Sequence, residues 1–551
     1  MKLNRILFLL TTLIISGCAN QIGPGGGEID RIPPKIVSVY PENGTVNFQD
    51  DYIEFTFSEY VDKRTVQDAF FVSPSIDGAP ELDWSGKSVR FNFPAEFKPD
   101  LTYVVTLGTQ IADLNNRNRM AAPFQFAFST GNKIDEGIIE GRIYDDKPLG
   151  TMLFAYSVGD TVINPTISQP KYISQAGEEG IFKILGMAEG TYRIFAVGDE
   201  YQDLFYNVGQ DTYGAPYTDV KLTENDTAGF TDLNFFLSKE DTSKPRLFNA
   251  TMTDRFHVLM ELSEEYDSSI ISSENFYLYD STADRRVDPR FVFHGKTKST
   301  ELVLVTTEEL PTANNIFLFA NRIIDKYGNE LRNDAIPLVV SDKPDTSAPS
   351  IFSVKDLGNQ RYLFELTDAF DSATAKKGIR IADRSNKLIN SSISFLDDAS
   401  FIVRPMQELK QREAYNIIVD LKYLIDAAGN SIDSLYRHRF AAETRLDYTG
   451  ISGRVAADEK LQNIKVVLKP TEKGKKEYQR NVGKNRGFTI NKVDPGRYLL
   501  WSYADKDSSN TYTYGLPFPY KESEQFTFYP DTLNLRARWP VGDVLLEYKA
   551  K

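Results

Sequence analysis

The 551-residue sequence has little of the chemistry that enzymes use, with one cysteine and three histidines. A single thiol can form neither an intramolecular disulfide nor a cysteine-based zinc site, which needs several thiolates. His257, His294 and His438 do not have the spacing of metal ligands, and the motifs H-E-x-x-H and G-x-S-x-G do not occur. We therefore expect a non-catalytic protein with no cofactor and no metal site.

Basic residues are too few for a nucleic-acid partner. The chain has 63 Lys and Arg against 77 Asp and Glu, a formal net charge of −14 and a pI near 5.0. A phosphate-binding face needs clustered basic residues, so nucleic acid is excluded. Trp and Met are scarce, at 3 and 7 residues, whereas Tyr and Phe number 29 and 36. Flat aromatic side chains pack well on a pleated surface, which favours an all-β fold.

An apolar run stands near the N-terminus. Residues 6–15 follow two basic residues and precede a Ser-Gly pair, an arrangement that is typical of an export signal. The apolar run is too short to span a bilayer, because a span takes about 20 residues. Residues 15–18, Ile-Ser-Gly-Cys, resemble the lipobox of bacterial lipoproteins. The resemblance implies removal of residues 1–17 and lipidation of Cys18, which anchors the protein in a membrane. The alternative is an ordinary cleaved signal followed by an incidental thiol.

Residues 18–34 are expected to form a flexible tether, because they are rich in Gly and end in Pro-Pro. Ala19 follows the cysteine, and by resemblance to enterobacterial lipoprotein sorting this implies the outer membrane. In Bacteroidota-type lipoproteins, surface export goes with acidic residues close to the cysteine, whereas Glu28 and Asp30 lie far from it here. The sequence leaves open whether the protein faces the cell surface or the periplasm.

One pattern recurs three times at a spacing near that of a β-sandwich module, about 100 residues. Each copy opens with an alternating strand that ends in an acidic corner, and closes with an aliphatic strand that runs into an Asp turn. The corners are Glu59 with Asp62, Glu264 with Asp267, and Asp368 with Asp371, and the turns start at Asp113, Asp325 and Asp426. With their proline openers these copies resemble the SbsA-type bacterial Ig-like domain, the first copy most closely. The resemblance implies Ig-like β-sandwiches.

A second pattern occurs twice. Residues 137–143 and 450–455 each place a strand between glycines, and residues 180–196 and 487–501 each place a Gly turn between two strands. A glycine at these points suits a tight hairpin. Both copies resemble the transthyretin-like, or carboxypeptidase-regulatory-like, sandwich, whose family role is usually structural or adhesive.

These repeats predict an all-β protein, a string of about five Ig-like and transthyretin-like β-sandwich modules after a lipoprotein signal peptide. Polar residues with Pro and Gly interrupt the strand patterns between the modules, as is typical of linkers. The predicted segments are the signal peptide 1–17, the lipidated cysteine and tether 18–34, Ig-like modules 35–132, 245–342 and 348–444, and transthyretin-like modules 136–241 and 449–551.

Acidic residues are the remaining candidates for chemistry. Paired carboxylates can act as glycosidase groups if they flank a bond at about 5 to 9.5 Å. The corner pairs favour a structural role instead, because the same pair stands at the same place in three modules. Residues 199–203 and 505–510 space their acids in a way that suits Ca²⁺, but neither completes the twelve-residue EF-hand pattern. Solvated loops are the simpler interpretation, and calcium binding is left open.

The predicted function is a non-catalytic, membrane-anchored protein-binding scaffold or accessory subunit of a cell-envelope assembly. Strings of sandwiches suit this function because they leave loops and edges free for envelope proteins. The alternative is a surface adhesin or glycan-binding lipoprotein. Exposed aromatics, such as Trp84 or those of residues 512–520, would then bind the glycan, although packing explains these aromatics equally well. The partner and the oligomeric state are left open.

We predict that Cys18 carries the lipid. Cells fed an alkyne fatty acid should label the wild-type protein and not the Cys18→Ala variant, because acylation needs the new cysteine terminus. Click chemistry with a fluorophore, followed by electrophoresis of the immunoprecipitated protein, measures this. Equal labelling of the two proteins would contradict the assignment.

Overall fold

The computed structural model describes residues 29–223, 229–411, 413–442 and 447–548. The predicted signal peptide and the predicted lipidation site Cys18 lie outside these residues. The described part of the chain consists mainly of strands paired into sheets, and no helix in it is long and apolar enough to cross a membrane. The predicted all-β fold, a string of β-sandwich modules, is confirmed.

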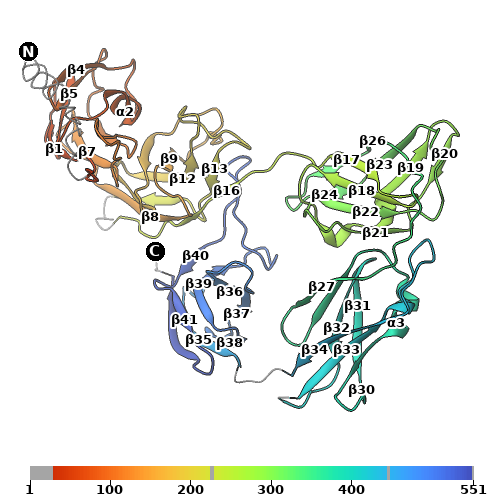
Figure 1. Ribbon diagram of the computed structural model, residues 1–551. Coiled ribbons are helices and arrows are strands. Elements are labelled where there is room, and N and C mark those ends of the chain that lie inside the picture. The colour runs from red at the N-terminus through yellow and green to blue at the C-terminus, as the bar shows by residue number, and fades with distance from the viewer. Residues whose placement is uncertain (1–28, 224–228, 412, 443–446, 549–551) are drawn as a thin grey trace, which may run out of the picture. The chain divides into compact units, whose positions relative to one another are not determined.

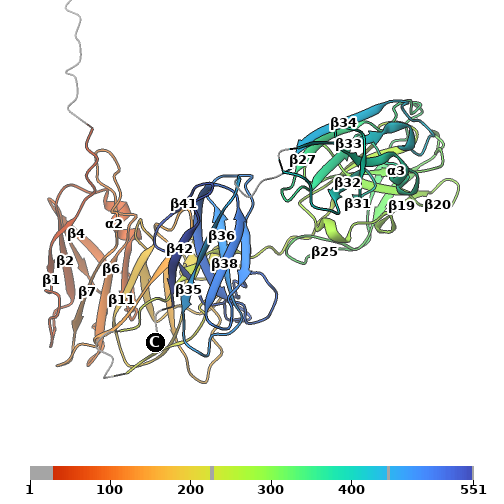
Figure 2. The ribbon, with the colours of Figure 1, turned by 90° about the horizontal axis from the view of Figure 1, so that it is seen from below.

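The first sandwich shows how an alternating sequence builds a two-layer core. In β2, Ile53, Phe55 and Phe57 are buried, and they alternate with residues that are half-buried. They pack with Phe126 and Phe128 of the second layer. The layers are sheets of order β1-β2-β5-β4 and β3-β6-β7. Figure 2 labels β1, β2 and β4 of the first sheet and β6 and β7 of the second. Their strands are β1 (Ile36–Tyr40), β2 (Tyr52–Phe57), β3 (Phe70–Ser73), β4 (Glu81–Ser85), β5 (Ser88–Asn92), β6 (Thr102–Leu107) and β7 (Phe124–Ser129).

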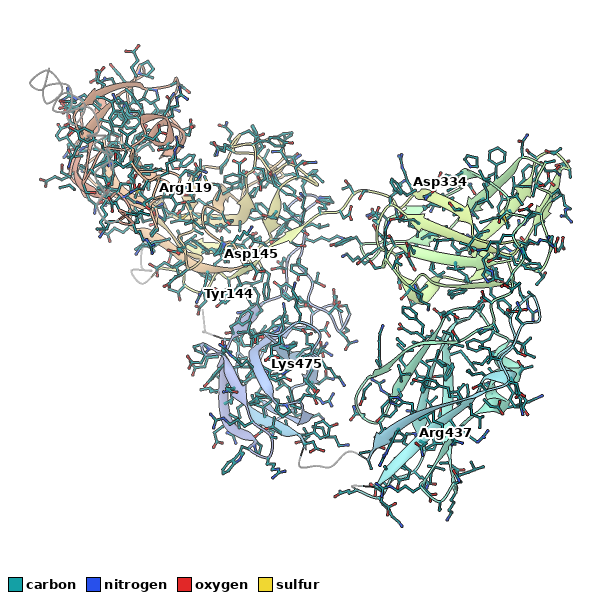
Figure 3. All side chains as sticks on the ribbon, viewed as in Figure 1. Arg119, Tyr144, Asp145, Asp334, Arg437 and Lys475 are labelled. Carbon is teal, nitrogen blue, oxygen red and sulfur yellow. The ribbon has the colours of Figure 1, made fainter. Side chains whose placement is uncertain are left out.

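A second sandwich has the same order with one more edge strand, β20, in sheets β17-β18-β22-β21 and β20-β19-β23-β26 (Figure 1). Asp334, labelled in Figure 3, lies on β26 and accepts a hydrogen bond of 2.8 Å from the backbone N–H of Leu247 on β17. The strands are β17 (Leu247–Met252), β18 (His257–Leu262), β19 (Phe276–Asp280), β20 (Arg285–Val287), β21 (Phe291–His294), β22 (Glu301–Val305), β23 (Ile316–Ala320), β24 (Ile323–Ile324), β25 (Glu330–Leu331) and β26 (Asp334–Leu338).

A third sandwich repeats the order once more, in sheets β27-β28-β32-β31 and β30-β29-β33-β34. The edge strands β1, β17 and β27 also share a one-residue bulge at the same point, after Ile36, Leu247 and Ile351. The two divergent copies therefore have the fold of the first. The strands are β27 (Ile351–Asp356), β28 (Tyr362–Leu366), β29 (Ile379–Ala382), β30 (Leu388–Ile389), β31 (Ser391–Asp397), β32 (Ser400–Pro405), β33 (Ala414–Asp420) and β34 (Leu435–Ala441).

The other repeat also forms a sandwich in both copies. The sheets β10-β9-β12-β13-β16 and β11-β8-β15 correspond to β37-β36-β39-β40 and β38-β35-β42, and β15 and β42 pair parallel to β8 and β35, the first strands of their copies. The repeated glycines Gly141 and Gly453 allow this pairing, because an added Cβ would lie 1.9 Å from the Leu233 carbonyl oxygen and 2.0 Å from that of Val544. That these modules are transthyretin-like stays a prediction.

The strands of these two modules complete the fold. In the first copy they are β8 (Gly137–Tyr144), β9 (Met152–Ser157), β10 (Tyr172–Gln175), β11 (Ile181–Met187), β12 (Gly190–Gly198), β13 (Thr212–Gly214), β14 (Val220–Leu222), β15 (Phe235–Phe236) and β16 (Ser238–Lys239). In the second they are β35 (Thr449–Ala456), β36 (Ile464–Pro470), β37 (Tyr478–Asn481), β38 (Gly487–Val493), β39 (Gly496–Ala504), β40 (Phe526–Phe528), β41 (Leu533–Leu535) and β42 (Val541–Glu547).

The described residues form five principal apolar cores, one in each sandwich. They divide into two compact units. Unit 1 contains residues up to Ser238 together with Thr513–Gln525, and unit 2 contains Lys239–Tyr512 and the residues from Phe526. The sequence prediction assigned all of residues 449–551 to one module, whereas residues 513–525 pack with unit 1. The other module boundaries stay predictions.

Buried polar groups join the first two modules within unit 1. Gln175 is 0% exposed, and its side-chain oxygen accepts hydrogen bonds from the backbone N–H and the hydroxyl of Thr109 at 2.6 and 3.0 Å. Its amide donates to the carbonyl oxygen of Gly150 at 3.0 Å. Ser73, also buried, accepts a bond of 3.0 Å from the N–H of Ile173. These bonds tie the two modules into one unit.

We predict that Gln175→Leu destabilises unit 1 by about 1–3 kcal/mol, because it leaves the buried N–H of Thr109 without its acceptor. Chemical denaturation followed by tryptophan and tyrosine fluorescence measures the loss. The matched control is Gln49→Leu, since Gln49 is exposed and should change stability by less than about 0.5 kcal/mol. Equal effects of the two substitutions would show that the Gln175 bonds do not hold the modules together.

Candidate functional site

The second acid of each predicted corner caps a helical turn. Asp62 accepts a hydrogen bond from the N–H of Arg64 at the start of α2 (Lys63–Asp68), and Asp267 does the same for η1 (Ser268–Ile270). Asp371 accepts two such bonds, of 2.9 and 3.1 Å, at the start of α3 (Ser372–Gly378). An aspartate at this position satisfies backbone donors that have no partner within the helix. The corner spacing therefore has a structural cause.

The first acid of each corner lies with two other carboxylates. In the second and third Ig-like modules the three carboxylates have oxygen atoms within 4.8 Å of one another; these clusters are Asp241, Glu264 and Asp325, and Asp345, Asp368 and Asp426. In the first module, burial and the charges of Asp113 and Asp30 raise the pKa of Glu59. Burial and the two neighbouring carboxylates likewise raise the pKa of Glu264.

In each of these modules, the turn that begins at the aspartate is hydrogen-bonded to the linker that precedes the module. Asp325 is 3% exposed and accepts hydrogen bonds from the N–H groups of Tyr327 and Asn329 at 2.7 and 2.8 Å. The side-chain amide of Asn329 then donates to the carbonyl oxygen of Asp241 at 2.9 Å. The equivalent bonds run from Asn118 to Asp30 at 3.0 Å and from Asn430 to Asp345 at 3.3 Å.

Sequence reasoning missed the linker acids Asp30, Asp241 and Asp345, which it assigned to the tether or to the junctions. The sequence does contain a signal for these residues, because each of the three aspartates stands four residues before a proline at the start of its module. Three carboxylates at this separation offer the hard oxygen ligands that Ca²⁺ takes, although Ca²⁺ needs 6 to 8 of them. In each module the turn aspartate already accepts backbone N–H groups, so the clusters serve the fold.

In the third cluster, a histidine from the preceding module neutralises the acids. His257 on β18 is 7% exposed, its Nε2 lies 2.8 Å from Asp368 Oδ1, and its Nδ1 lies 2.8 Å from Asp254 Oδ1. A neutral imidazole has one N–H, so it can donate to one carboxylate, whereas the imidazolium donates to both. His257 therefore links the second and third of these sandwiches as a cation. Asp345 also lies beside this histidine.

The pKa of His257 agrees with a protonated imidazole. Burial works to lower the pKa of His257, but the hydrogen bonds and charges of Asp254 and Asp368 outweigh it and raise the pKa to about 10. The same junction carries an ion pair of 3.2 Å between Arg290 and Asp371. Apolar contacts lie beside it, in a cluster of Phe291, Phe293, Val305, Ala369 and Ala399.

The other two histidines have packing roles. Nδ1 of His294 lies 2.6 Å from the hydroxyl of Tyr266, which stacks on the ring. His438 packs against Tyr362 and Phe364, and burial lowers its pKa. The described residues thus place the three histidines in different environments and do not bring them together.

The two acidic loops are built differently. Asp199 accepts hydrogen bonds from the backbone N–H groups of Asp203 and Leu204 at 3.2 and 3.0 Å, which closes its own loop. Asp505 instead pairs with Lys465 at 3.3 Å, and the two side chains are 0% and 4% exposed. The lysine also donates to Asn510 at 2.6 Å. A cation supplied by the protein therefore stands beside Asp505, and whether either loop binds calcium stays open.

The aromatic residues considered for glycan binding take part in packing. Trp84 on β4 is half-buried, with its ring stacked 6.5 Å from Phe57 and the ammonium of Lys63 at 5.2 Å. Tyr512 packs edge-on against Trp501 at 5.9 Å. The rest of the tyrosine-rich stretch belongs to residues 513–525 and packs with unit 1.

A small cleft lies within unit 1. It offers two carboxylates and two amides beside apolar side chains, and its lining residues are Asp68, Phe71, Gln110, Gly150, Met152, Asp199, Gln202 and Leu204. Asp68 and Asp199 are the carboxylates among these lining residues, and burial raises the pKa of Asp199.

Comparison with known proteins identifies the first module. Residues 30–130 match the family of bacterial Ig-like domains. The Ig-like prediction is confirmed for these residues, and no curated protein matches the chain at a significant level.

Among solved structures, the N-terminal part of the bacterial S-layer protein SbsC is similar at 12% identity and a TM-score of 0.17, over 37% of this chain and 45% of that one. The chain thus spans less than half of that protein's length. Domains 1–6 of SbsC are similar at 11% identity and a TM-score of 0.16, over 91% of this chain and 67% of that one. The major pilin BcpA of Bacillus cereus is similar at 8% identity and 0.14, over 75% and 99%. Scores this low show no shared overall structure.

We predict that the His257 link weakens in alkaline solution. Its pKa is raised from 6.5 to about 10, so the stabilisation is fully present below pH 6.5 and is lost as pH rises through about 10. His257→Gln should destabilise unit 2 by about 3–5 kcal/mol at neutral pH, because it leaves buried carboxylates without a cation. The difference in stability between the wild type and this variant should shrink above pH 10.

Denaturant titrations of both proteins between pH 6 and 10.5 test this prediction. The control is His438→Gln, because burial lowers the pKa of His438 and this histidine therefore does not titrate near pH 10. A constant difference between wild type and His257→Gln from pH 6 to 10.5 would show that the histidine is neutral.

Proposed function

We propose that this protein is a lipid-anchored outer-membrane protein whose β-sandwich modules bind other envelope proteins as a non-catalytic scaffold or accessory subunit. The single observation that carries the proposal concerns the bulges of the edge strands. Residues 37, 248 and 352 occupy the bulge of β1, β17 and β27, and they are Val37, Phe248 and Phe352. Their exposed fractions are 67%, 72% and 53%.

Exposed apolar residues are common when they stand singly, so recurrence at one structural position is what matters here. A bulge on an edge strand usually helps to prevent pairing with other chains. A large apolar side chain placed there in each Ig-like module instead offers a contact beside unpaired backbone groups. Partners that add a strand to a sheet edge use both features, with the backbone giving affinity and the side chain giving specificity.

The lipid anchor would make weak contacts effective. Confinement to a membrane raises the effective concentration of the protein toward its neighbours, and several weak contacts on one chain then act together. Three similar contacts on three modules fit this distributed mode of binding better than one deep pocket does. Transthyretin-like modules, whose usual family role is structural or adhesive, would fit the same use.

A specific observation favours glycan binding as the second candidate. Trp539 is 74% exposed, and it lies in a tight turn that bridges back to Arg536. An exposed indole is the kind of flat surface on which a sugar ring stacks. In that case one compact site in the last module, and not the three bulges, would bind the ligand.

We predict that the triple variant Val37→Ser, Phe248→Ser, Phe352→Ser loses partner binding and keeps its fold. Burying one Phe side chain contributes about 1.5–3 kcal/mol, and 1.4 kcal/mol is a factor of ten in affinity, so recovery of crosslinked partners should fall at least tenfold. The full-length lipidated proteins are crosslinked in intact envelopes and the partners are identified by mass spectrometry.

The matched control replaces three exposed apolar residues outside the bulges, Val162, Ile167 and Val339, which are 83%, 74% and 82% exposed. Its crosslinks should equal those of the wild type. Undiminished crosslinking by the bulge variant would contradict the proposal. Glycan-array binding that disappears with Trp539→Ala, without any crosslinked protein, would support the adhesin.

A further inference from the structure

The loop between β39 and β40 of the last module extends away from its own sandwich. In the second module, the equivalent connection between β12 and β13 covers residues 199–211. In the last module it covers residues 505–525, and its second half, Thr513–Gln525, packs with unit 1. The extra length therefore forms a separate element that belongs to another part of the fold.

This element is a hairpin with a defined shape. Leu516 and Lys521 exchange two backbone hydrogen bonds of 3.0 Å, and the base is closed by a bond of 3.0 Å from the N–H of Glu524 to the carbonyl oxygen of Thr513. Gly515 has φ +69°, and a Cβ there would lie 2.4 Å from the Lys521 carbonyl oxygen. Glycine is required at that position, so the sequence specifies the hairpin locally.

The hairpin lies on an apolar face of a sheet, and such a face has to be shielded from water. On β9 and β12, residues 153, 155, 194 and 196 face the core of the second module. The alternate residues are apolar too and form a second buried cluster on the other face, where the members from these strands are Met152, Phe154, Tyr156, Phe195 and Val197. A strand that is apolar on both sides has to be covered on both. Leu516 and Tyr520 of the hairpin pack on this cluster.

Polar contacts fix the position of the hairpin. The ring of Tyr520 lies 3.5 Å from the guanidinium carbon of Arg193, which is held by Asp219 through two hydrogen bonds of 2.8 Å. The hydroxyl of Tyr213 donates to the carbonyl oxygen of Gly515 at 3.0 Å. The N–H of Ser523 donates to the carbonyl oxygen of Pro216 at 3.2 Å.

We propose that residues 513–525 are a latch, a hairpin of the last module that binds the outer face of β9, β12 and β13 and fastens the end of the chain to the second module. The docking face is therefore an interaction surface for an aromatic hairpin, and its occupant is this chain's own segment. Both ends of the latch continue into unit 2, so the chain passes between the units at residues 238/239, 512/513 and 525/526. This inference does not depend on the proposed scaffold function.

Hydrogen exchange of the full-length lipidated protein in detergent tests the latch. In the wild type the N–H of Ser523 should exchange slowly, because its acceptor is Pro216 of the second module. Tyr520→Ala and Arg193→Ala remove the stacked pair from opposite sides, and each should speed exchange across residues 513–525 at least tenfold. The matched control is Tyr201→Ala, in which a tyrosine that is 62% exposed is lost from the second module and exchange of the latch should not change.

The outcomes separate the possible occupants. Slow exchange that is independent of protein concentration, with monomers in mass photometry, supports a latch within one chain. Exchange that slows with rising concentration as dimers appear would overturn it, because the hairpin would then occupy a second copy. Fast exchange of residues 513–525 in the wild type, or no effect of either variant, would also overturn it.

Discussion

The separation of the chain's apolar residues into five cores is the constraint on which the rest of the structure depends. A sandwich of this size uses the inner faces of its strands for its own core, so neighbouring modules meet through groups on their outer surfaces. Besides apolar side chains, these groups include the buried Gln175 in unit 1 and His257 in unit 2. Buried polar contacts of this kind require fixed geometry, so they set orientation more than they add stability.

The three Ig-like repeats use one acidic corner in different electrostatic settings. In the second module Glu264 has two neighbouring carboxylates, and its pKa is raised. In the third module Asp368 occupies the same place but accepts a hydrogen bond from His257, which comes from the module before it. The repeat therefore conserves the capping aspartate and the Asp turn, which the fold of each module needs, while the first corner acid has become available for a contact between modules.

The second and last modules differ in a similar way. Both have the same strand order, but the β39–β40 connection of the last module is longer and ends in the hairpin at residues 513–525. The second module presents the face that this hairpin covers. One copy of this module therefore presents an apolar surface, and the other copy supplies the hairpin that covers it. The bulge residues Val37, Phe248 and Phe352 are exposed, which is why we assign partner binding to them.

The amino-acid sequence by itself determined the features that rest on local patterns. Alternation at residues 52–57 produced a strand with one buried face, and Asp371 before a short helical segment produced its cap. Tertiary structure decided the partners of Gln175, His257 and Tyr520, because each meets residues tens to hundreds of positions away. Spacing along the chain reports which face a side chain occupies within its own element, but contacts between modules depend on how complete sandwiches meet, and no local pattern encodes that.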